Sequence, residues 1–228
     1  MVPLLVILAL VLGLAVLPQV WVRRVIARHS VDRPDFVGTG GQFARHLLDG
    51  MKLHHVKVEA TDLGDHYDPD AKAVRLLPQH LQGRTLSALV IAAHETGHAM
   101  QDATDYRPLK DRTRLARQAI WIEKVGAVVM LAAPIMMVVA KAPHLMLVQA
   151  LAGVLILGLS IAMHAYTLPV EYDASFRRAL PLLEAGRYIP DQDLPAARQI
   201  LRAAAFTYVA AAAMSLLDVA RWIRVLRL

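Results

Sequence analysis

The sequence predicts a mainly α-helical membrane protein with one small β-sheet and a helix that carries a metal-binding motif. Hydrophobic residues make up 56% of the 228 residues, and the mean hydropathy of +0.41 is high for a soluble domain of this size. Apolar residues gather in long uncharged runs, which are typical of membrane-spanning helices. The motif HETGH lies at residues 94–98, in a shorter apolar segment. We therefore expect about three transmembrane helices around a small site-bearing region, plus a C-terminal apolar helix.

The first run covers residues 1–22, which contain no charged side chain and end at Arg23 and Arg24. About twenty apolar residues suffice to cross a bilayer. A cleaved signal peptide is the alternative interpretation. The run lacks both a charged start and a small-residue cleavage site, so a retained anchor is favoured.

Two further runs, at residues 125–140 and 142–170, predict a helical hairpin with a turn at residues 142–144. The first helix of this hairpin is expected to start near Ile120. A fourth run, at residues 203–217, is short and rich in alanine. We expect it to lie at the membrane interface, because three arginines at a spacing of three residues follow it.

The net charge of +6 follows the membrane pattern rather than indicating a nucleic-acid partner. Basic residues cluster at the ends of the apolar runs: Arg23, Arg24, Arg28, Arg112, Arg114, Arg117, Lys124, Arg177 and Arg178. By the positive-inside rule, residues 23–120 and 171–202 face the cytoplasm. The expected location is the bacterial inner (plasma) membrane, multi-pass, with the site on the cytoplasmic side and the lipid bilayer as a partner.

Five segments follow from these runs. They are an N-terminal transmembrane anchor (1–22), a cytoplasmic region with the sheet and the motif helix (23–119), a transmembrane hairpin (120–168), a helix with a connector (169–202) and a C-terminal apolar or interfacial helix (203–228).

Inside the second segment, residues 39–48 predict a helix capped by Thr39. Alternating residues at 55–60 and 71–77 predict a small antiparallel sheet, and the polar stretch 65–69 between them predicts a turn. The motif helix is expected to begin at Thr85 or Ser87.

The motif itself predicts a metal site. His94 and His98 are four residues apart, so they share one face of a helix and can bind the same ion. Glu95 then lies beside the ion, where it can accept a proton from a water molecule. The chain has no cysteine, so the ligands must be histidine and carboxylate, as in catalytic zinc sites. One zinc ion per chain is expected, and another divalent metal is the alternative.

A catalytic zinc ion takes three protein ligands, and Glu171 is the candidate for the third. It follows the third apolar run directly, on the same predicted side of the membrane as the motif. In the alternative interpretation, Glu171 and Asp173 are ordinary acidic residues at a helix start. The presence of the HExxH motif favours the ligand.

Three blocks of sequence resemble the YugP-like family of bacterial membrane zinc metallopeptidases. They are DHYDP at 65–69 with KAVRL at 72–76, AAHETGHAMQ at 92–101, and LPVEYDAS at 168–175. The resemblance implies a gluzincin-like fold in which His94, His98 and Glu171 bind zinc and Glu95 is the catalytic base. The layout is also similar to that of HtpX-type and prenyl-processing membrane proteases. Those proteins have an aspartate four residues after the glutamate ligand, where this chain has Ser175; Asp173 is the nearest carboxylate.

The implied reaction is hydrolysis of peptide bonds by a zinc metalloendopeptidase. His66, Tyr67, Tyr172 and Arg177 are candidate donors to the oxyanion or the substrate, and Asp173 is a candidate partner of a zinc-binding histidine. The strand at 71–77 could pair with an extended substrate. Unfolded or membrane-associated polypeptides are the expected substrates, in membrane protein quality control.

The sequence disfavours three alternative functions. An intramembrane site-2-type protease would need a Leu-Asp-Gly sequence after the motif, but the chain's own, at residues 48–50, precedes it. A membrane metal-binding or scaffold protein without catalytic activity would not need the complete catalytic set, yet His94, Glu95, His98 and Glu171 are all present. A channel or transporter would require charged or broken spans.

Overall fold

The computed structural model describes residues 2–140 and 166–207, with the single positions 151, 155, 159 and 163. Residues Gln19–Lys110 and Leu168–Thr207 form one compact unit, here called the site unit. The other described residues belong to a second unit. All the residues of the predicted metal site lie in the site unit.

The prediction of about three transmembrane helices is wrong: among the residues described, no helix is long and apolar enough to cross a membrane. Helix α1 (Val2–Arg28) ends in a basic stretch with Arg23, Arg24 and Arg28. Helix α5 (Arg107–Ala140) starts well before the expected Ile120. Charged residues occupy its first half, so its uncharged part is shorter than the ~20 residues that a bilayer requires.

Other parts of this prediction fall outside the described residues. They are the turn at 142–144, most of the run 142–170 and most of the C-terminal segment 203–228.

The two helices that were predicted for the site unit are confirmed. Helix α2 (Gly40–Gly50) begins with a capping box, in which Thr39 and Gln42 exchange side-chain to backbone hydrogen bonds. Helix α4 (Leu86–Ala103) is capped by Thr85, whose hydroxyl oxygen accepts the Ala88 N–H at 3.0 Å.

The sheet has three strands, β1 (Lys57–Ala60), β2 (His66–Asp68) and β3 (Ala73–Leu76), in the order β1-β3-β2. The predicted antiparallel pairing of the first and last strands is wrong, because β1 runs parallel to β3. Residues 66–68 form an antiparallel strand inside a stretch predicted as a turn. Three residues are too few to reveal an alternating pattern, and the polar neighbours of Tyr67 favoured a turn.

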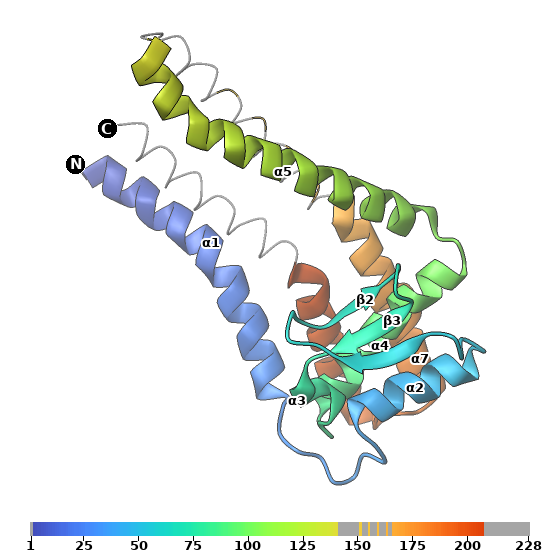
Figure 1. The fold of residues 1–228 in the computed structure, drawn as a ribbon. Helices are drawn as coiled ribbons and strands as arrows, with labels where there is room; N and C mark the ends of the chain where they lie inside the picture. The colour runs from blue at the N-terminus through green and yellow to red at the C-terminus, as the bar shows by residue number, and fades with distance from the viewer. Residues whose placement is uncertain are drawn as a thin grey trace. The chain divides into compact units, whose positions relative to one another are not determined.

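Helix α4 is the central element of the site unit. It passes behind the sheet (Figure 1) and packs against α2, β3 and the π-helix η1 (Asp173–Ala179). The core around it is aliphatic and fully buried, with Leu48, Leu76, Leu183, Ile200 and Leu201 as its largest such side chains. Helix α3 (Pro78–Leu81) connects the sheet to this core.

Glu171 lies inside a continuous helical segment, whereas the sequence predicted that it would begin a helix. Residues 166–172 are α-helical, η1 follows without a break, and α7 (Leu180–Ala185) comes next. Leu180 N–H donates to the Ser175 carbonyl five residues earlier, as in a π-helix. Pro181 lacks an N–H, so it could not continue the α-helical pattern of hydrogen bonds.

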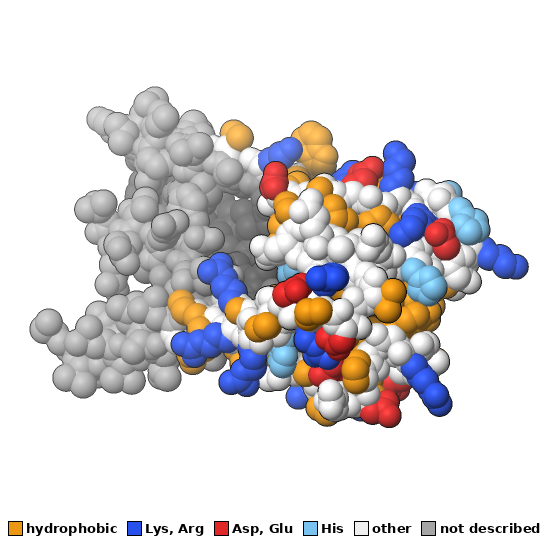
Figure 2. All heavy atoms as spheres, turned by 90° about the horizontal axis from the view of Figure 1, so that it is seen from below, with side chains coloured by type: hydrophobic (Ala, Val, Ile, Leu, Met, Phe, Trp, Pro, Cys, Tyr) orange, Lys and Arg blue, Asp and Glu red, His pale blue; other side chains and the backbone are white. Residues whose placement is uncertain are grey.

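The surface mixes both signs of charge. On the face drawn in Figure 2, basic and acidic side chains lie among one another. This face therefore does not present a single-sign field. Elsewhere in the described structure, ion pairs join Arg33 with Asp35 at 2.7 Å and Arg75 with Asp68 at 2.6 Å.

Candidate metal centre

Helix α4 places the two histidines of the motif side by side. Their ring centroids are 4.8 Å apart, and both side chains are buried, as is Glu95 between them in sequence. Donor atoms of His94, Glu95 and His98 lie within 4.8 Å of one another. The helical spacing thus produces the cluster that the motif predicts.

Glu171 meets this cluster from the neighbouring helical segment. Its Oε2 atom lies 3.2 Å from Nε2 of His94 and 3.2 Å from Nε2 of His98. Ligands at 2.0–2.1 Å from a tetrahedral zinc ion are about 3.3 Å from one another. The three donor atoms have the chemistry and the mutual spacing that a zinc ion requires.

The carboxyl group of Glu171 is anionic at neutral pH. Burial alone would raise its pKa, but the charge of His98 and hydrogen bonds from both histidines outweigh burial and hold the pKa well below its ordinary value. An anionic carboxylate is the form that binds a metal cation.

A close crossing of α4 and η1 brings these residues together. A Cβ atom on Gly97 would lie 2.7 Å from the Ala174 carbonyl oxygen, so only glycine allows the two helices to approach this closely. The glycine of the motif is therefore a packing requirement of the centre.

Each histidine has a hydrogen-bonded partner at Nδ1. Nδ1 of His98 lies 2.9 Å from Gln101 Oε1, and Nδ1 of His94 lies 3.0 Å from Ser175 Oγ. Ser175 therefore does contact a histidine of the centre, in the position where the similar proteases have aspartate. Asp173, also predicted near the site, is hydrogen bonded to Gln101 instead.

Sequence reasoning missed Gln101 and Arg178. Gln101 is three residues after His98, so helical spacing could have identified it as a neighbour on the same face. Arg178 donates a hydrogen bond to Asp173, five residues earlier, at 2.7 Å. An α-helical spacing of three or four residues does not indicate this pair, because the segment between them is a π-helix.

The two candidate residues of the sheet have hydrogen-bond partners outside the metal cluster. Side chains alternate between the faces of a strand, so His66 and Tyr67 point in opposite directions. The Tyr67 hydroxyl donates to Asp102 at 2.6 Å, and His66 Nδ1 lies 2.8 Å from the Gly64 carbonyl. Burial and the Asp102 carboxylate raise the pKa of Tyr67 well above its ordinary value.

Tyr172 and Arg177 are both exposed side chains. Tyr172 is 56% exposed and stacks on Phe176, with ring centroids 4.9 Å apart. Arg177 is exposed on η1. Neither side chain is one of the histidine partners described above.

The hypothesis that residues 71–77 pair with a substrate is wrong, because β3 already has a strand on each side. Its neighbours β1 and β2 are the edges of the described sheet. Of these two, β2 packs against α4.

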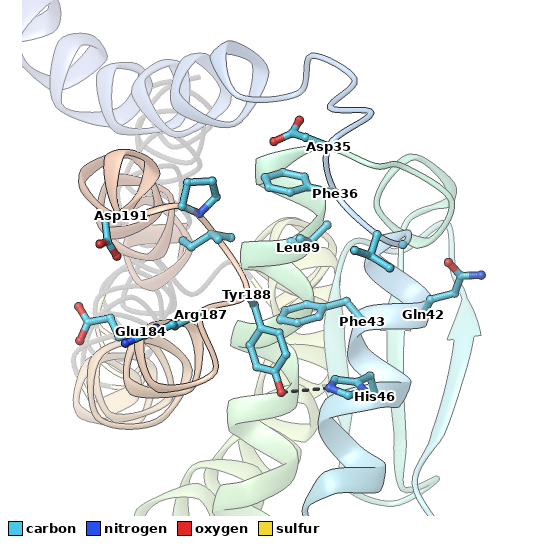
Figure 3. Close-up of a pocket in the computed structure, with 14 residues that line it drawn as sticks. Asp35, Phe36, Gln42, Phe43, His46, Leu89, Glu184, Arg187, Tyr188 and Asp191 are labelled. Atoms are coloured by element: carbon cyan, nitrogen blue, oxygen red, sulfur yellow. Dashed lines mark hydrogen bonds between the residues drawn. The ribbon is translucent and has the colours of Figure 1, made fainter.

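A separate groove of about 1150 Å³ lies on another side of α4. Its lining mixes aromatic, aliphatic and charged side chains, and Tyr188 is hydrogen bonded to His46 at 3.0 Å within it (Figure 3). Leu89 contributes from α4. None of the predicted site residues lines this groove.

Comparison with known proteins agrees with this geometry. The chain is 34% identical over 216 residues to the "Putative membrane protease YugP" of Bacillus subtilis (strain 168), an alignment that covers 94% of this chain and 92% of that protein. No solved structure matches. Residues 4–227 match the model of the family described as "Putative neutral zinc metallopeptidase". This match spans nearly the whole sequence and confirms the resemblance carried by the three blocks, so the chain belongs to this family of neutral zinc metallopeptidases.

Proposed function

We propose that the protein is a zinc-dependent metalloendopeptidase that holds one zinc ion through His94, His98 and Glu171. The observation that carries this proposal is the position of Glu171 Oε2, 3.2 Å from Nε2 of each histidine. When both Nε2 atoms are deprotonated, their lone pairs and the Glu171 carboxylate converge at the spacing of ligands around one zinc ion. Membership of the neutral zinc metallopeptidase family supports zinc as that cation.

Glu95 is the proposed catalytic base. When bound, zinc acidifies a water molecule and polarises the carbonyl group of the scissile bond. Glu95 lies beside both histidines and is buried. It accepts the proton of the attacking water and later delivers it to the leaving amine.

The proposed substrates are unfolded or membrane-associated polypeptides in extended conformation. Strand β2 lies at an edge of the described sheet and packs against the helix that carries the motif. An extended segment could add to this edge through main-chain hydrogen bonds. Cleavage would then depend weakly on side chains, and a peptide library that reveals strict side-chain specificity would contradict this part of the proposal.

We also propose a location at the bacterial plasma membrane, with the site on the cytoplasmic side and a role in protein quality control. The Bacillus relative is named a membrane protease, which supports the location. Fractionation of cells that express the tagged protein tests it: recovery from the supernatant of a high-speed spin, rather than from the membrane pellet, would contradict it.

The decisive experiment compares the wild type with Glu95→Gln. Both proteins are purified, their bound metal is quantified, and both are incubated with casein. We expect zinc in both proteins and chelator-sensitive cleavage by the wild type alone, with a rate about 10²–10⁴-fold lower in the variant. Equal cleavage by both proteins would overturn the role of Glu95. Stoichiometric zinc without cleavage of casein or of a peptide library would indicate a metal-binding protein that does not hydrolyse peptides.

A further inference from the structure

The buried polar groups behind His98 form a connected chain. Gln101 is fully buried and Asp173 nearly so, and Arg178 donates to Asp173 at the outer end. Burying an ion pair costs desolvation energy, and a packed apolar side chain is often at least as stabilising. Packing alone therefore does not explain why these three polar residues lie between the two helices.

The contacts of Gln101 fix the orientation of its amide group. One terminal atom lies 2.8 Å from the Val170 carbonyl oxygen and 2.9 Å from Asp173 Oδ2. Both partners can only accept hydrogen bonds, so this atom must be the NH₂ group. The amide oxygen is then the atom that faces His98 Nδ1 at 2.9 Å.

This orientation decides the state of His98. An amide oxygen can only accept, so Nδ1 of His98 must carry a proton and donate it. In the neutral ring, Nε2 then has a free lone pair, and Nε2 is the atom that lies 3.2 Å from Glu171. The hydrogen-bond partner of one ring nitrogen thus selects the nitrogen that can bind a metal.

His94 is oriented by a simpler device. The Ser175 hydroxyl lies 3.2 Å from the Leu201 carbonyl oxygen, which can only accept its proton. The hydroxyl oxygen is then free to accept a proton from Nδ1 of His94. No charged group takes part on this side.

We infer that Gln101, oriented by Asp173 and Arg178, is a positioning residue that holds His98 in the Nδ1–H form and directs its Nε2 atom to the metal. Ser175 does the same for His94. The inference rests on the proposed zinc site, but it concerns metal affinity and proton position rather than cleavage. The two histidines would differ in what orients their rings. His98 is oriented by Gln101 and the Asp173–Arg178 ion pair, and His94 is oriented by the Ser175 hydroxyl, which donates to a backbone carbonyl.

The test measures zinc affinity by competition with a chromogenic chelator. Gln101→Met keeps the size of the side chain but cannot accept a hydrogen bond, and we expect it to weaken zinc binding by about 10–100-fold. The matched control is Gln79→Met, at an exposed position in α3, which should bind zinc like the wild type. Unchanged zinc affinity in Gln101→Met would overturn the inference.

A rescue variant separates positioning from general packing. Gln101→Glu supplies an acceptor to His98 but places a second carboxylate beside Asp173, so it should bind zinc weakly. Adding Asp173→Asn removes the repulsion and provides an amide donor, while Arg178 can still donate to the amide oxygen. We expect the double variant to recover most of the affinity, although its carboxylate cannot donate to Val170. Failure of the double variant to exceed Gln101→Glu would contradict a role through His98.

A spectroscopic measurement needs no variant. In the wild-type protein labelled with ¹⁵N-histidine and loaded with ¹¹³Cd, metal coupling should appear at Nε2 and a bound proton at Nδ1 of His98. Coupling to Nδ1 would overturn the inference and leave a metal site in place. Correct coupling in a protein that cleaves nothing would overturn the proposed function and leave the inference in place.

Discussion

Two regions of the site unit were expected to build one site, and they differ in what they contribute. The crossing of α4 and η1 brings together His94, His98 and Glu171, although Glu171 is distant from the motif in sequence. The sheet offered His66 and Tyr67, and its hydrogen bonds commit both to other partners. The crossing therefore supplies the metal-binding residues, and Tyr67 ties the sheet to the end of the motif helix.

The difference arises from the periodicity of the two structures. On a helix, residues three and four apart point the same way, so the spacing of the motif defines a shared face. On a strand, neighbouring residues point to opposite faces, and the identity of the inner face depends on what packs there. Tyr67 points inward to Asp102 on α4, where it ties the sheet to the end of the motif helix.

Removing the carboxylate at the crossing should have the largest effect. We expect Glu171→Ala to lose zinc affinity by more than the ~10–100-fold typical of a partner that only hydrogen bonds to a ligand, and to lose cleavage with it. The matched control is Glu184→Ala, because Glu184 is exposed and pairs with Arg198 at 2.7 Å. Zinc content and casein cleavage are measured for both. Full zinc occupancy in Glu171→Ala would remove Glu171 from the ligand set.

The closeness of the crossing can be tested next. In Gly97→Ala, the added methyl group would meet the Ala174 carbonyl oxygen at 2.7 Å, so we expect a loss of about 1–3 kcal/mol in unfolding free energy together with weaker zinc binding. Gly50→Ala is the control, since nothing lies within 4 Å of its added carbon. Urea unfolding compares the two. An equal effect of both substitutions would show that the crossing tolerates a wider separation.

The same contrast explains how much could be predicted from the sequence. The capped helices α2 and α4 and the metal motif follow from local signals, namely Thr39, Thr85 and the spacing of the two histidines. The partners of those histidines depend on the crossing and on the π-helix. A π-helix shifts the residues that face α4, so Ser175 contacts His94, whereas Asp173 contacts Gln101 rather than a histidine.

The span predicted from the run at residues 125–140 is wrong for a related reason. The run was predicted to cross the membrane because of its hydropathy, but it belongs to a longer helix, α5, whose first half is charged. The order of strands in the sheet could not be derived either, because parallel pairing of β1 with β3 depends on contacts between residues distant in sequence.

A smaller effect on the free energy of unfolding is expected from a substitution in the sheet. Tyr67→Phe removes the hydrogen bond to Asp102, which retains Lys72 as a partner at 2.5 Å. We expect a loss of about 0.5–1.5 kcal/mol in unfolding free energy, with zinc content and cleavage close to those of the wild type. Thermal and urea unfolding measure the first, and the casein assay measures the second. A large loss of cleavage with full stability would return Tyr67 to the active site.

The pH dependence of stability gives the finest test of this hydrogen bond. Because burial and Asp102 raise the pKa of Tyr67 in the folded state, folding favours the neutral phenol. This contribution is fully present below the unfolded value of about pH 10 and is lost as the pH rises above it. The wild type should therefore lose stability faster than Tyr67→Phe between about pH 9 and about pH 11. Urea unfolding across this range measures the difference, with Tyr172→Phe as an exposed control. A constant difference between wild type and Tyr67→Phe would mean that the phenol of Tyr67 titrates alike in the folded and unfolded states, which would contradict an effect of burial and Asp102 on its pKa.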